Sequence, residues 1–426
     1  MTVAVTFSAL IGLILLGAPI AITLLISTSA GLVFTTELPV AVVVQRMYTG
    51  IDSFTLIAIP LFILTGRMMA LGGITNELLE LSRSLVGFMR GGLAYVNVVS
   101  SMFFAGITGS ATADTSSVGA VLIPAMQKRG YDTGFSVAVT AASSTIGIII
   151  PPSIPLVIYA VVSGTSVGRL FLAGVIPGFM IGFALLLVCG ILARRRGYPV
   201  EGTFSLKRAV KATIRGIPPL TTIVIIVGGI TFGVFTPTEA AGVAAAYSFL
   251  LGTIYYRELK LSMMPRIMLE VSLVTAAVSL MIATASGLGW LLAAEQVPRE
   301  IGGWITQISS NPIVVLLLMN LVFLFVGTWL DLTPALIIFT PIFLPIATAL
   351  GIDPVHFGLI AVVNLGIGLF TPPVGLCLFV ACSIAKIPIG KAIVPTLPFF
   401  LAMLVVLLLI TLVPALVLTL PNAIMG

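Results

Sequence analysis

Two Pro–Pro pairs stand at matching places in two long apolar segments of this chain. The first is Pro151-Pro152 and the second is Pro372-Pro373, which are 372 − 151 = 221 residues apart, and each follows a glycine four residues earlier. Proline removes a backbone N–H and glycine weakens a helix, so neither segment can be one continuous helix. Carbonyls freed at such a break can replace the water around a small cation, and freed N–H groups suit an anion.

A proline kink that only shapes helix packing is the alternative, because membrane helices tolerate proline. A single break would favour that interpretation. Two breaks at matched positions, one in each half of the chain, favour instead a transporter whose binding site lies between two repeats.

Two acids and several neutral oxygen donors lie near these breaks. Asp114 and Asp331 could each bind a cation, carry a proton or cap the helix that follows, and capping is the favoured interpretation because Asp caps helices well. The neutral donors are Thr108, Ser110, Thr112, Thr328, Asn364 and Thr371. Hard monovalent cations bind such oxygens together with backbone carbonyls, so coupling to Na⁺ is chemically sensible.

The composition places these residues in a membrane. Of 426 residues, 59% are hydrophobic and only 8% are charged, and the mean hydropathy is +1.24. These values indicate an all-α polytopic membrane protein. The net charge of +6 reflects membrane orientation rather than nucleic-acid binding. The chain has no phosphate-binding G-x-x-x-x-G-K-[ST] loop, and its three cysteines fit no metal or disulfide spacing.

Hydropathy and helical periodicity divide the chain into spans, surface helices and hairpins. Continuous spans are predicted at residues 5–34, 54–70, 170–193, 217–235, 237–256, 265–293 and 392–420, and broken spans at 133–162 and 354–383. Residues 76–90 and 297–310 are predicted to lie along the membrane surface, and a basic connector follows residue 193. Residues 91–129 and 311–350 are predicted re-entrant hairpins, because their polar tips would face lipid poorly.

The two halves match beyond the double prolines. Asp114 stands ten residues before Pro124, and Asp331 stands ten residues before Pro341. Asp132 and Asp353 each stand nineteen residues before a double proline. Agreement of this many markers predicts an internal repeat.

The basic residues then predict an orientation, because cytoplasmic loops are rich in Lys and Arg. The loops placed inside follow Arg67, Arg90, Arg129, Arg194, Arg257 and Lys386. Only Arg46, Arg169 and Arg299 of the 20 basic residues then lie outside. This arrangement puts the N-terminus in the cytoplasm and the C-terminus in the periplasm. The two hairpins then enter from opposite sides, so the repeats are expected to be inverted.

Several longer motifs resemble one known family. They are Gln45-Arg46-Met47, Ala58-Ile59-Pro60-Leu61-Phe62, Gly109-Ser110-Ala111 with Ala113-Asp114, Pro151-Pro152-Ser153, Phe235-Thr236-Pro237-Thr238-Glu239 and Thr371-Pro372-Pro373-Val374-Gly375. Together they resemble the large membrane (permease) subunit of tripartite ATP-independent periplasmic (TRAP) transporters, within the ion-transporter superfamily. The likeness covers essentially the whole chain.

The resemblance implies a transporter of the bacterial inner membrane rather than an enzyme. It implies Na⁺-driven import of a small organic acid, of the C4-dicarboxylate or sialic acid class, delivered by a periplasmic substrate-binding protein. It also implies a separate small membrane subunit and an elevator mechanism. The scaffold would comprise residues 1–90 and 194–310. Residues 91–193 and 311–426 would be the two repeat cores, whose hairpins and broken helices form the transport domain.

The resemblance also implies two or more Na⁺ sites, with one where each hairpin tip meets a broken helix. The first set is Ser110, Gly147, Ile150 and Ser153, and the second is Gly327, Gly368, Thr371 and Val374. No organic cofactor is implied.

The hairpins and broken spans contain almost no basic residues, which bears on how an acid is bound. No Lys or Arg lies between residues 91 and 124, 133 and 168, or 311 and 383. A buried substrate carboxylate must therefore be held by hydroxyls, backbone N–H groups and half-helix dipoles. The expected substrate site lies between the hairpin tips, at Ser110, Thr112, Thr328 and Asn364 together with Asp114 and Asp331.

Two other functions are the alternatives to a Na⁺-coupled importer. One is a stand-alone carrier that is coupled to protons through Asp114 or Asp331, and the other is a channel.

Overall fold

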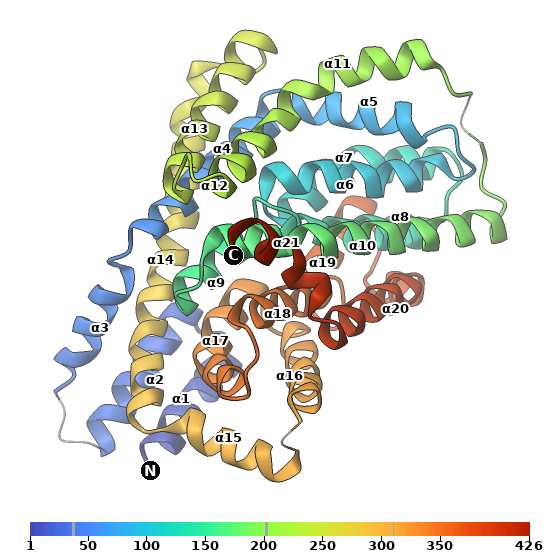
Figure 1. Cartoon of the computed structure of the whole chain (residues 1–426). Helices are drawn as coiled ribbons and strands as arrows, with labels where there is room; N and C mark the ends of the chain where they lie inside the picture. The colour runs from blue at the N-terminus through green and yellow to red at the C-terminus, as the bar shows by residue number, and fades with distance from the viewer. Residues whose placement is uncertain (36–38, 201–202, 310) are drawn as a thin grey trace.

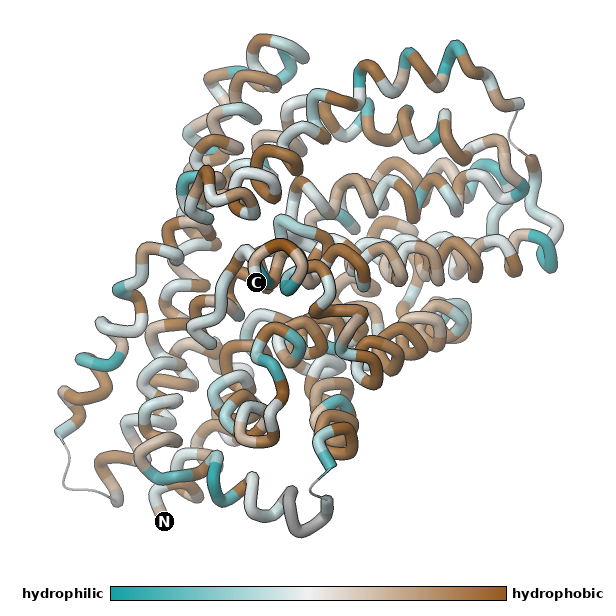
Figure 2. Tube along the Cα trace, in the orientation of Figure 1, coloured by the Kyte–Doolittle hydropathy of each residue, from teal (hydrophilic) through white to brown (hydrophobic). Residues whose placement is uncertain are grey.

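The computed structural model describes residues 1–35, 39–200, 203–309 and 311–426, and the regular elements of these residues are helices (Figure 1). Six helical stretches are long and apolar enough to cross a bilayer: Phe54–Leu71, Val167–Arg195, Leu206–Thr231, Leu261–Ala294, Leu332–Ala349 and Gly390–Leu412. Apolar residues run along most of the trace (Figure 2). The chain therefore has the all-helical architecture of a multi-pass membrane protein.

The first predicted span, residues 5–34, is wrong as a single helix. It forms α1 (Thr2–Leu15) and α2 (Ile20–Thr35), which are separated by Gly17 with a φ of +76° and by Pro19. Gly accepts this left-handed backbone, and Pro cannot continue a helix, so the chain turns between them. The two helices pack against each other, as the side chain of Thr6 in α1 shows: it fills the place that a Cβ on Gly31 in α2 would take.

The next helices lead to the first hairpin. α3 (Ala41–Ile51) packs beside α14 (Met264–Ala294), where the guanidinium of Arg46 lies 5.2 Å from the ring centroid of Trp290. A short 3₁₀ turn (Phe54–Ile57) opens α4 (Ala58–Leu71). The predicted surface helix at 76–90 is α5 (Ile74–Val86), and its counterpart at 297–310 is α15 (Val297–Ile308). Residue 310 lies outside the described residues.

Both predicted hairpins are present as pairs of helices. The first consists of α6 (Gly92–Thr108) and α7 (Ala111–Lys128), and the second of α16 (Pro312–Gly327) and α17 (Leu332–Ala349). Each turn is short, and Gly109 takes a φ of +61° at the first. The prolines within α7 and α17 lie on the outgoing helices.

Both double prolines break their helices as predicted. α8 (Thr133–Ser144) and a 3₁₀ turn (Thr145–Ile148) end before the first pair, and α9 (Ile154–Ser163) begins after it. α18 (Pro354–Gly368) ends before the second pair, and α19 (Leu376–Ala385) follows it. Residues 134–144 and 355–368 are all buried. The two broken helices thus lie at the centre of the packed structure.

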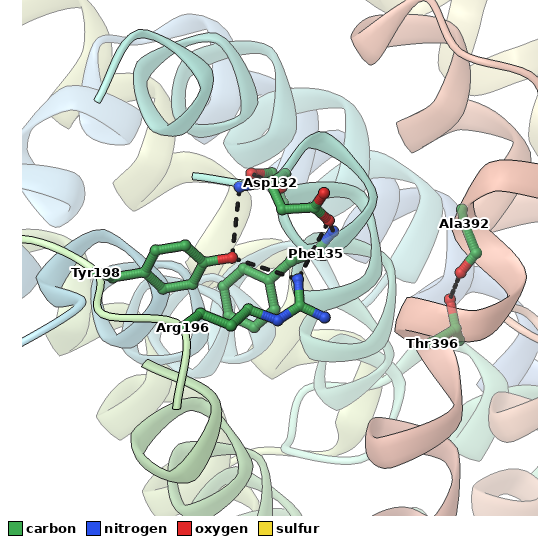
Figure 3. A network of polar contacts seen from close by, with 7 residues as sticks. Asp132, Phe135, Arg196, Tyr198, Ala392 and Thr396 are labelled. Carbon is green, nitrogen blue, oxygen red and sulfur yellow. Dashed lines mark hydrogen bonds and ion pairs between the residues drawn. The ribbon is translucent and has the colours of Figure 1, made fainter. Parts of the chain in front are cut away.

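α10 (Val167–Arg195) is joined by an ion pair to the start of each broken helix. Asp132 caps α8 and Asp353 caps α18, and each carboxylate also pairs with an arginine at one end of α10. Arg196 lies 3.3 Å from Asp132, and Arg169 lies 3.7 Å from Asp353. Figure 3 shows the first of these ends, where Arg196 also donates to the hydroxyl of Tyr198 at 3.4 Å.

The basic connector is partly helical, which corrects the prediction that a span begins only at residue 217. α11 (Leu206–Ile223) begins at Ser205, whose hydroxyl caps it, and continues through a π turn (Val224–Gly228) into α12 (Gly229–Thr231). Four basic residues therefore stand on its first turns rather than in a loop. α13 (Pro237–Leu250) begins after Thr236, which caps it and forms a full capping box with Glu239.

The last predicted span, residues 392–420, is also divided. α20 (Gly390–Leu412) ends just before Val413, and α21 (Ala415–Met425) turns back across α10 (Figure 1). Asn422 of α21 accepts a hydrogen bond of 2.7 Å from Arg169 of α10. Pro414 explains the break, because the ring of a proline clashes with the residue before it when that residue has helical backbone angles.

Candidate functional site

The first hairpin tip lies against the first helix break. Gly109 at the tip accepts a backbone hydrogen bond of 3.4 Å from the N–H of Ile154, the first residue of α9. Ser110 caps α7, its hydroxyl accepting from the N–H of Ala113, and it lies 3.3 Å from the hydroxyl of Thr112. Both hydroxyls are partly exposed, so they can reach a ligand at this tip.

Asp114 does not cap a helix, because Ser110 takes that role and Asp114 stands in the first turn of α7. Its carboxylate is fully buried, and one oxygen accepts a hydrogen bond from the hydroxyl of Thr108. The other oxygen has no hydrogen-bond partner among the described residues. It lies against Gly147, where an added Cβ would collide with it. A buried carboxylate oxygen without a partner is costly, and a cation at this point would relieve that cost.

The other residues of the first predicted Na⁺ set lie along the same break. A Cβ on Gly147 would stand 3.7 Å from the carbonyl carbon of Ser110, so the tip and the broken helix meet here. The hydroxyl of Ser153 caps α9, accepting from the N–H of Leu156 at 3.3 Å, and donates to the carbonyl of Ile148. Ile150 is buried, and its side chain packs against Gly178 of α10.

The second predicted set is brought together in the same way. A Cβ on Gly368 would collide with the carbonyl oxygen of Gly327, so these two glycines allow the tip of the second hairpin to touch α18. The N–H of Val374 donates to the carbonyl of Thr328 at 3.2 Å. The hydroxyl of Thr371 donates to the carbonyl of Ile367 at 2.6 Å, which leaves its lone pairs available to a cation.

A cavity of about 150 Å³ lies between the two hairpin tips. Ser110 and Thr112 line it from the first tip, and Asp331 and Thr333 line it from the second. Asp331 occupies the cap position of α17, but its side chain makes no capping hydrogen bond, and it is exposed. Apolar residues of α4 and α14 also line the cavity, so groups from the hairpins and from other helices meet in it.

Three residues of the expected substrate site do not line this cavity: the buried Asp114, Thr328 and Asn364. Asn364 is fully buried, and its amide nitrogen donates to the carbonyl and side-chain oxygens of Asn320 at 3.0 and 2.9 Å. Asn320 in turn donates to Thr411 of α20. The hydroxyl of Thr328 donates to the carbonyl of Phe325 at 2.8 Å. Asn364 therefore ties helices together, since buried amides hold membrane helices in register.

An adjoining cavity of about 320 Å³ contains the charge of Arg67, which in sequence lies near the end of the predicted span 54–70 and served only to predict orientation. Ser110 and Thr112 line this cavity too, together with Ser116 and the guanidinium-bearing side chain of Arg67 on α4. Arg67 pairs with Glu270 of α14 at 3.4 Å and keeps 45% of its side chain exposed. An arginine within the apolar helix Ala58–Leu71 is a signal for function that could have found it.

Thr333 is the other residue that the sequence analysis missed. It stands two positions after Asp331, as Ser116 stands two positions after Asp114, and Ser116 lines the adjoining cavity, so the hairpin repeat contained the signal. Among the described residues, no three His, Cys, Asp or Glu side chains cluster to hold a metal ion. Cation binding at this site would therefore depend on backbone carbonyls and hydroxyls with a single carboxylate.

Comparison with known proteins matches residues 7–416 to the family "Tripartite ATP-independent periplasmic transporter, DctM component". The sialic acid TRAP transporter large permease protein SiaM of Vibrio cholerae is 41% identical over 98% of this chain and 97% of its own length. The C4-dicarboxylate TRAP transporter large permease protein DctM of Pseudomonas aeruginosa is 41% identical over 88% of each chain. The uncharacterized protein YgiK of Salmonella typhimurium is 47% identical over 90% of this chain and 88% of its own.

Two solved structures share the fold at low sequence identity. The YdaH transporter of Alcanivorax borkumensis superimposes with a TM-score of 0.62 at 16% identity, covering 87% of this chain and 86% of its own. MtrF of Neisseria gonorrhoeae superimposes with a TM-score of 0.60 at 12% identity, covering 92% of each chain. The arrangement of helices is therefore that of known membrane transporters.

Proposed function

The chain belongs to the DctM family of TRAP transporter large permeases, and on this premise we propose that it imports a small organic acid across the bacterial inner membrane. The relatives named for sialic acid and for C4-dicarboxylates support these two substrate classes. A separate small membrane subunit and a periplasmic substrate-binding protein would complete the transporter.

The cavity between the hairpin tips is the observation that carries this proposal. Its walls offer the hydroxyls of Ser110, Thr112 and Thr333, which suit the carboxylate and hydroxyl groups of an organic acid. The N-terminal N–H groups of α7 and α17 point toward the same tips and favour negative charge. Arg67 adds the guanidinium that the hairpins lack, placed where a substrate carboxylate could pair with it.

We further propose that uptake is coupled to Na⁺ at the two junctions of tip and broken helix. The unpaired oxygen of Asp114 beside Gly147 supports the first site, with Ser110, Ile150 and Ser153 completing it. The contact of Gly327 with Gly368, beside Thr371 and Val374, supports the second. Bound Na⁺ would supply the positive charge that offsets Asp114 and favours an anionic substrate nearby.

An elevator between inverted repeats is part of the proposal. Residues 91–193 and 311–426 would form the transport domain, and residues 1–90 and 194–310 the scaffold. Matching interactions support the repeat: Ser143 bonds Asn97 of the first hairpin, and Asn364 bonds Asn320 of the second. Ser143 and Asn364 are 364 − 143 = 221 residues apart, which is the spacing of the double prolines.

The proposed orientation rests on basic residues. The loops after Arg67, Arg90, Arg129, Arg194, Arg257 and Lys386 would face the cytoplasm, and the C-terminus the periplasm. The expectation of a cytoplasmic N-terminus assumed one crossing between residues 5 and 34. Because that run forms two helices that double back, the orientation proposed here begins at Arg67.

Reconstitution tests the proposed function. The chain and its small subunit, placed in proteoliposomes, should take up radiolabelled substrate only when loaded binding protein is added outside and Na⁺ is present. Replacing Na⁺ with choline should abolish uptake, and Asp114→Asn should do so with Na⁺ present. Saturable uptake that needs neither the binding protein nor Na⁺ would contradict the proposal. Uptake driven by a proton gradient in choline would favour the stand-alone carrier, and non-saturable flux would favour a channel.

A further inference from the structure

A strongly basic cleft lies away from the hairpin tips, between α5, the end of α7 and the start of α11. It comprises two neighbouring cavities of about 400 and 470 Å³, both lined by Glu80, Ser205 and Arg208. The first also contains Arg83 of α5 with Lys128 and Arg129 at the end of α7. This cleft is not the substrate site, because the 18 residues of α7 separate it from the tip by roughly 27 Å.

The charges in this cleft are far from balanced. Seven basic residues line the two cavities, since Lys207, Lys211 and Arg215 join those of the first. Two acids line them, Glu77 and Glu80, which leaves an excess of 7 − 2 = 5 positive charges. Among the described residues a single ion pair joins members of this set, between Arg215 and Glu77 at 3.6 Å. Basic residues are common on the cytoplasmic side of any membrane protein, but here three elements direct them around one hollow.

An exposed apolar stripe runs along α11 beside these charges. Leu206, Val210, Ile214 and Ile217 follow one another at helical spacing, and each is at least 51% exposed. The same helix contributes Arg208, Lys211 and Arg215 to the basic cleft. The first turns of α11, divided in this way, suit the boundary between lipid headgroups and acyl chains. The ligand that matches both faces has a negative headgroup and long apolar chains.

We propose that this cleft binds an anionic phospholipid, with its phosphate held by Arg83, Arg129 and Arg208. Arginine pairs with phosphate through two parallel hydrogen bonds, and basic pockets between membrane helices bind anionic headgroups. The hydroxyls of Thr203 and Ser205 add donors at the same place. The acyl chains lie along the apolar stripe of α11. The lipid thereby links the end of the first hairpin to α5 and α11.

Native mass spectrometry of the detergent-purified full chain tests this site. The protein is incubated with phosphatidylglycerol, with phosphatidylcholine, or with inorganic phosphate, and bound ligand is counted at each concentration. Phosphatidylglycerol should be retained about tenfold more tightly than phosphatidylcholine. Arg83→Gln with Arg208→Gln should weaken its retention at least tenfold, because two of the arginines on the phosphate are lost.

The matched control removes two exposed basic residues outside the cleft, Lys260→Gln with Lys391→Gln, and should retain phosphatidylglycerol as the natural chain does. Thermal unfolding of both variants checks that each remains folded. Equal retention of the two lipids, or unchanged retention by the cleft variant, would overturn the proposal. Binding of inorganic phosphate that displaces phosphatidylglycerol and depends on the same arginines would identify a free-phosphate site instead of a lipid site.

Discussion

At the scale of single residues, Thr371 and Arg67 are the side chains whose proposed roles in Na⁺ and substrate binding are easiest to test. Thr371 stands at the second helix break with its hydroxyl proton already committed to Ile367. Arg67 faces the cavity while paired with Glu270. Each side chain therefore makes one bond within the protein and also has atoms available to a ligand. Its substitution removes both, so a control variant that loses a comparable bond away from the site separates the two roles.

We expect Thr371→Val to raise the Na⁺ concentration needed for half-maximal uptake, because it removes a candidate ligand oxygen while keeping the side-chain shape. The loss of its bond to Ile367 should cost only about 0.5–1.5 kcal/mol of stability. The matched control is Thr396→Val on α20, where the same bond to the carbonyl four residues earlier is 2.7 Å long (Figure 3). An identical Na⁺ titration for both variants would argue against Thr371 as a ligand.

Arg67→Gln should raise the KM for the organic acid at least tenfold, because a charge-assisted bond to its carboxylate is lost. The initial rate of uptake is measured as the concentration of loaded binding protein is varied. The initial rate of efflux is measured separately as the internal substrate concentration is varied. Arg266→Gln is the control, since Arg266 pairs with the same Glu270 at 3.1 Å but does not line the cavity. If both variants change KM alike, the effect comes through Glu270 rather than through the substrate.

At the scale of elements, the decisive feature is how each hairpin is fastened to its broken helix. The first is tied by Asn97, Thr140 and Ser143, and the second by Asn320 and Asn364. These bonds are buried, where they fix the relative position of two helices that lipid alone would not hold together. The tips can therefore meet the breaks at close range, as the glycine contacts require.

Asn364→Ala should lower the thermal stability by about 1 kcal/mol and leave the KM for substrate unchanged, because Asn364 is bonded to Asn320 rather than exposed to the cavity. A double-mutant cycle with Asn320→Ala should give a coupling energy of about 0.6–1.7 kcal/mol. The cycle with Asn97→Ala, in the other hairpin, should be additive. A raised KM with normal stability would return Asn364 to the substrate site.

For the whole molecule, the elevator proposal requires that the two groups of helices slide past each other. The contact between α14 and α17 crosses that boundary, because a Cβ on Gly289 would lie 3.3 Å from the Cβ of Pro341. By contrast, a Cβ on Gly216 of α11 would lie 3.5 Å from the Cβ of Leu81 of α5, within the proposed scaffold. Both distances are close to the roughly 3.5–4.5 Å of natural disulfides.

We expect the pair Gly289→Cys with Pro341→Cys to stop uptake on oxidation and to recover with a reductant, because the cross-link would hold the transport domain against α14. Gly216→Cys with Leu81→Cys should cross-link without loss of uptake. The three native cysteines are buried, so the introduced pairs react in their place. Full uptake by the oxidised first pair, with the cross-link confirmed by mass spectrometry, would rule out sliding at this boundary.

The sequence alone determined the breaks, the hairpins and the polar tips, because these follow from local rules. A double proline removes two helical N–H donors, and the helices before Pro151 and Pro372 end there, although Pro218-Pro219 is accommodated within α11. A Gly-, Ser- and Thr-rich stretch forms a poor lipid-facing span in any fold. Gly17 and Pro414 are signals of the same local kind, but each lies between two apolar stretches that together are long enough to be one span. The first and last predicted spans, residues 5–34 and 392–420, were therefore each wrong as a single helix.

Only the tertiary structure decided which of the polar residues share a cavity. Ser110, Thr112, Asp331 and Thr333 come from two hairpins more than 200 residues apart, and Arg67 comes from a third helix. Asn364 looked equally suitable in sequence, yet packing turns it toward Asn320. Side-chain direction depends on how helices are rotated against each other, and that rotation is set by long-range contacts such as Gly327 with Gly368. The spacing of residues along the chain does not determine this rotation.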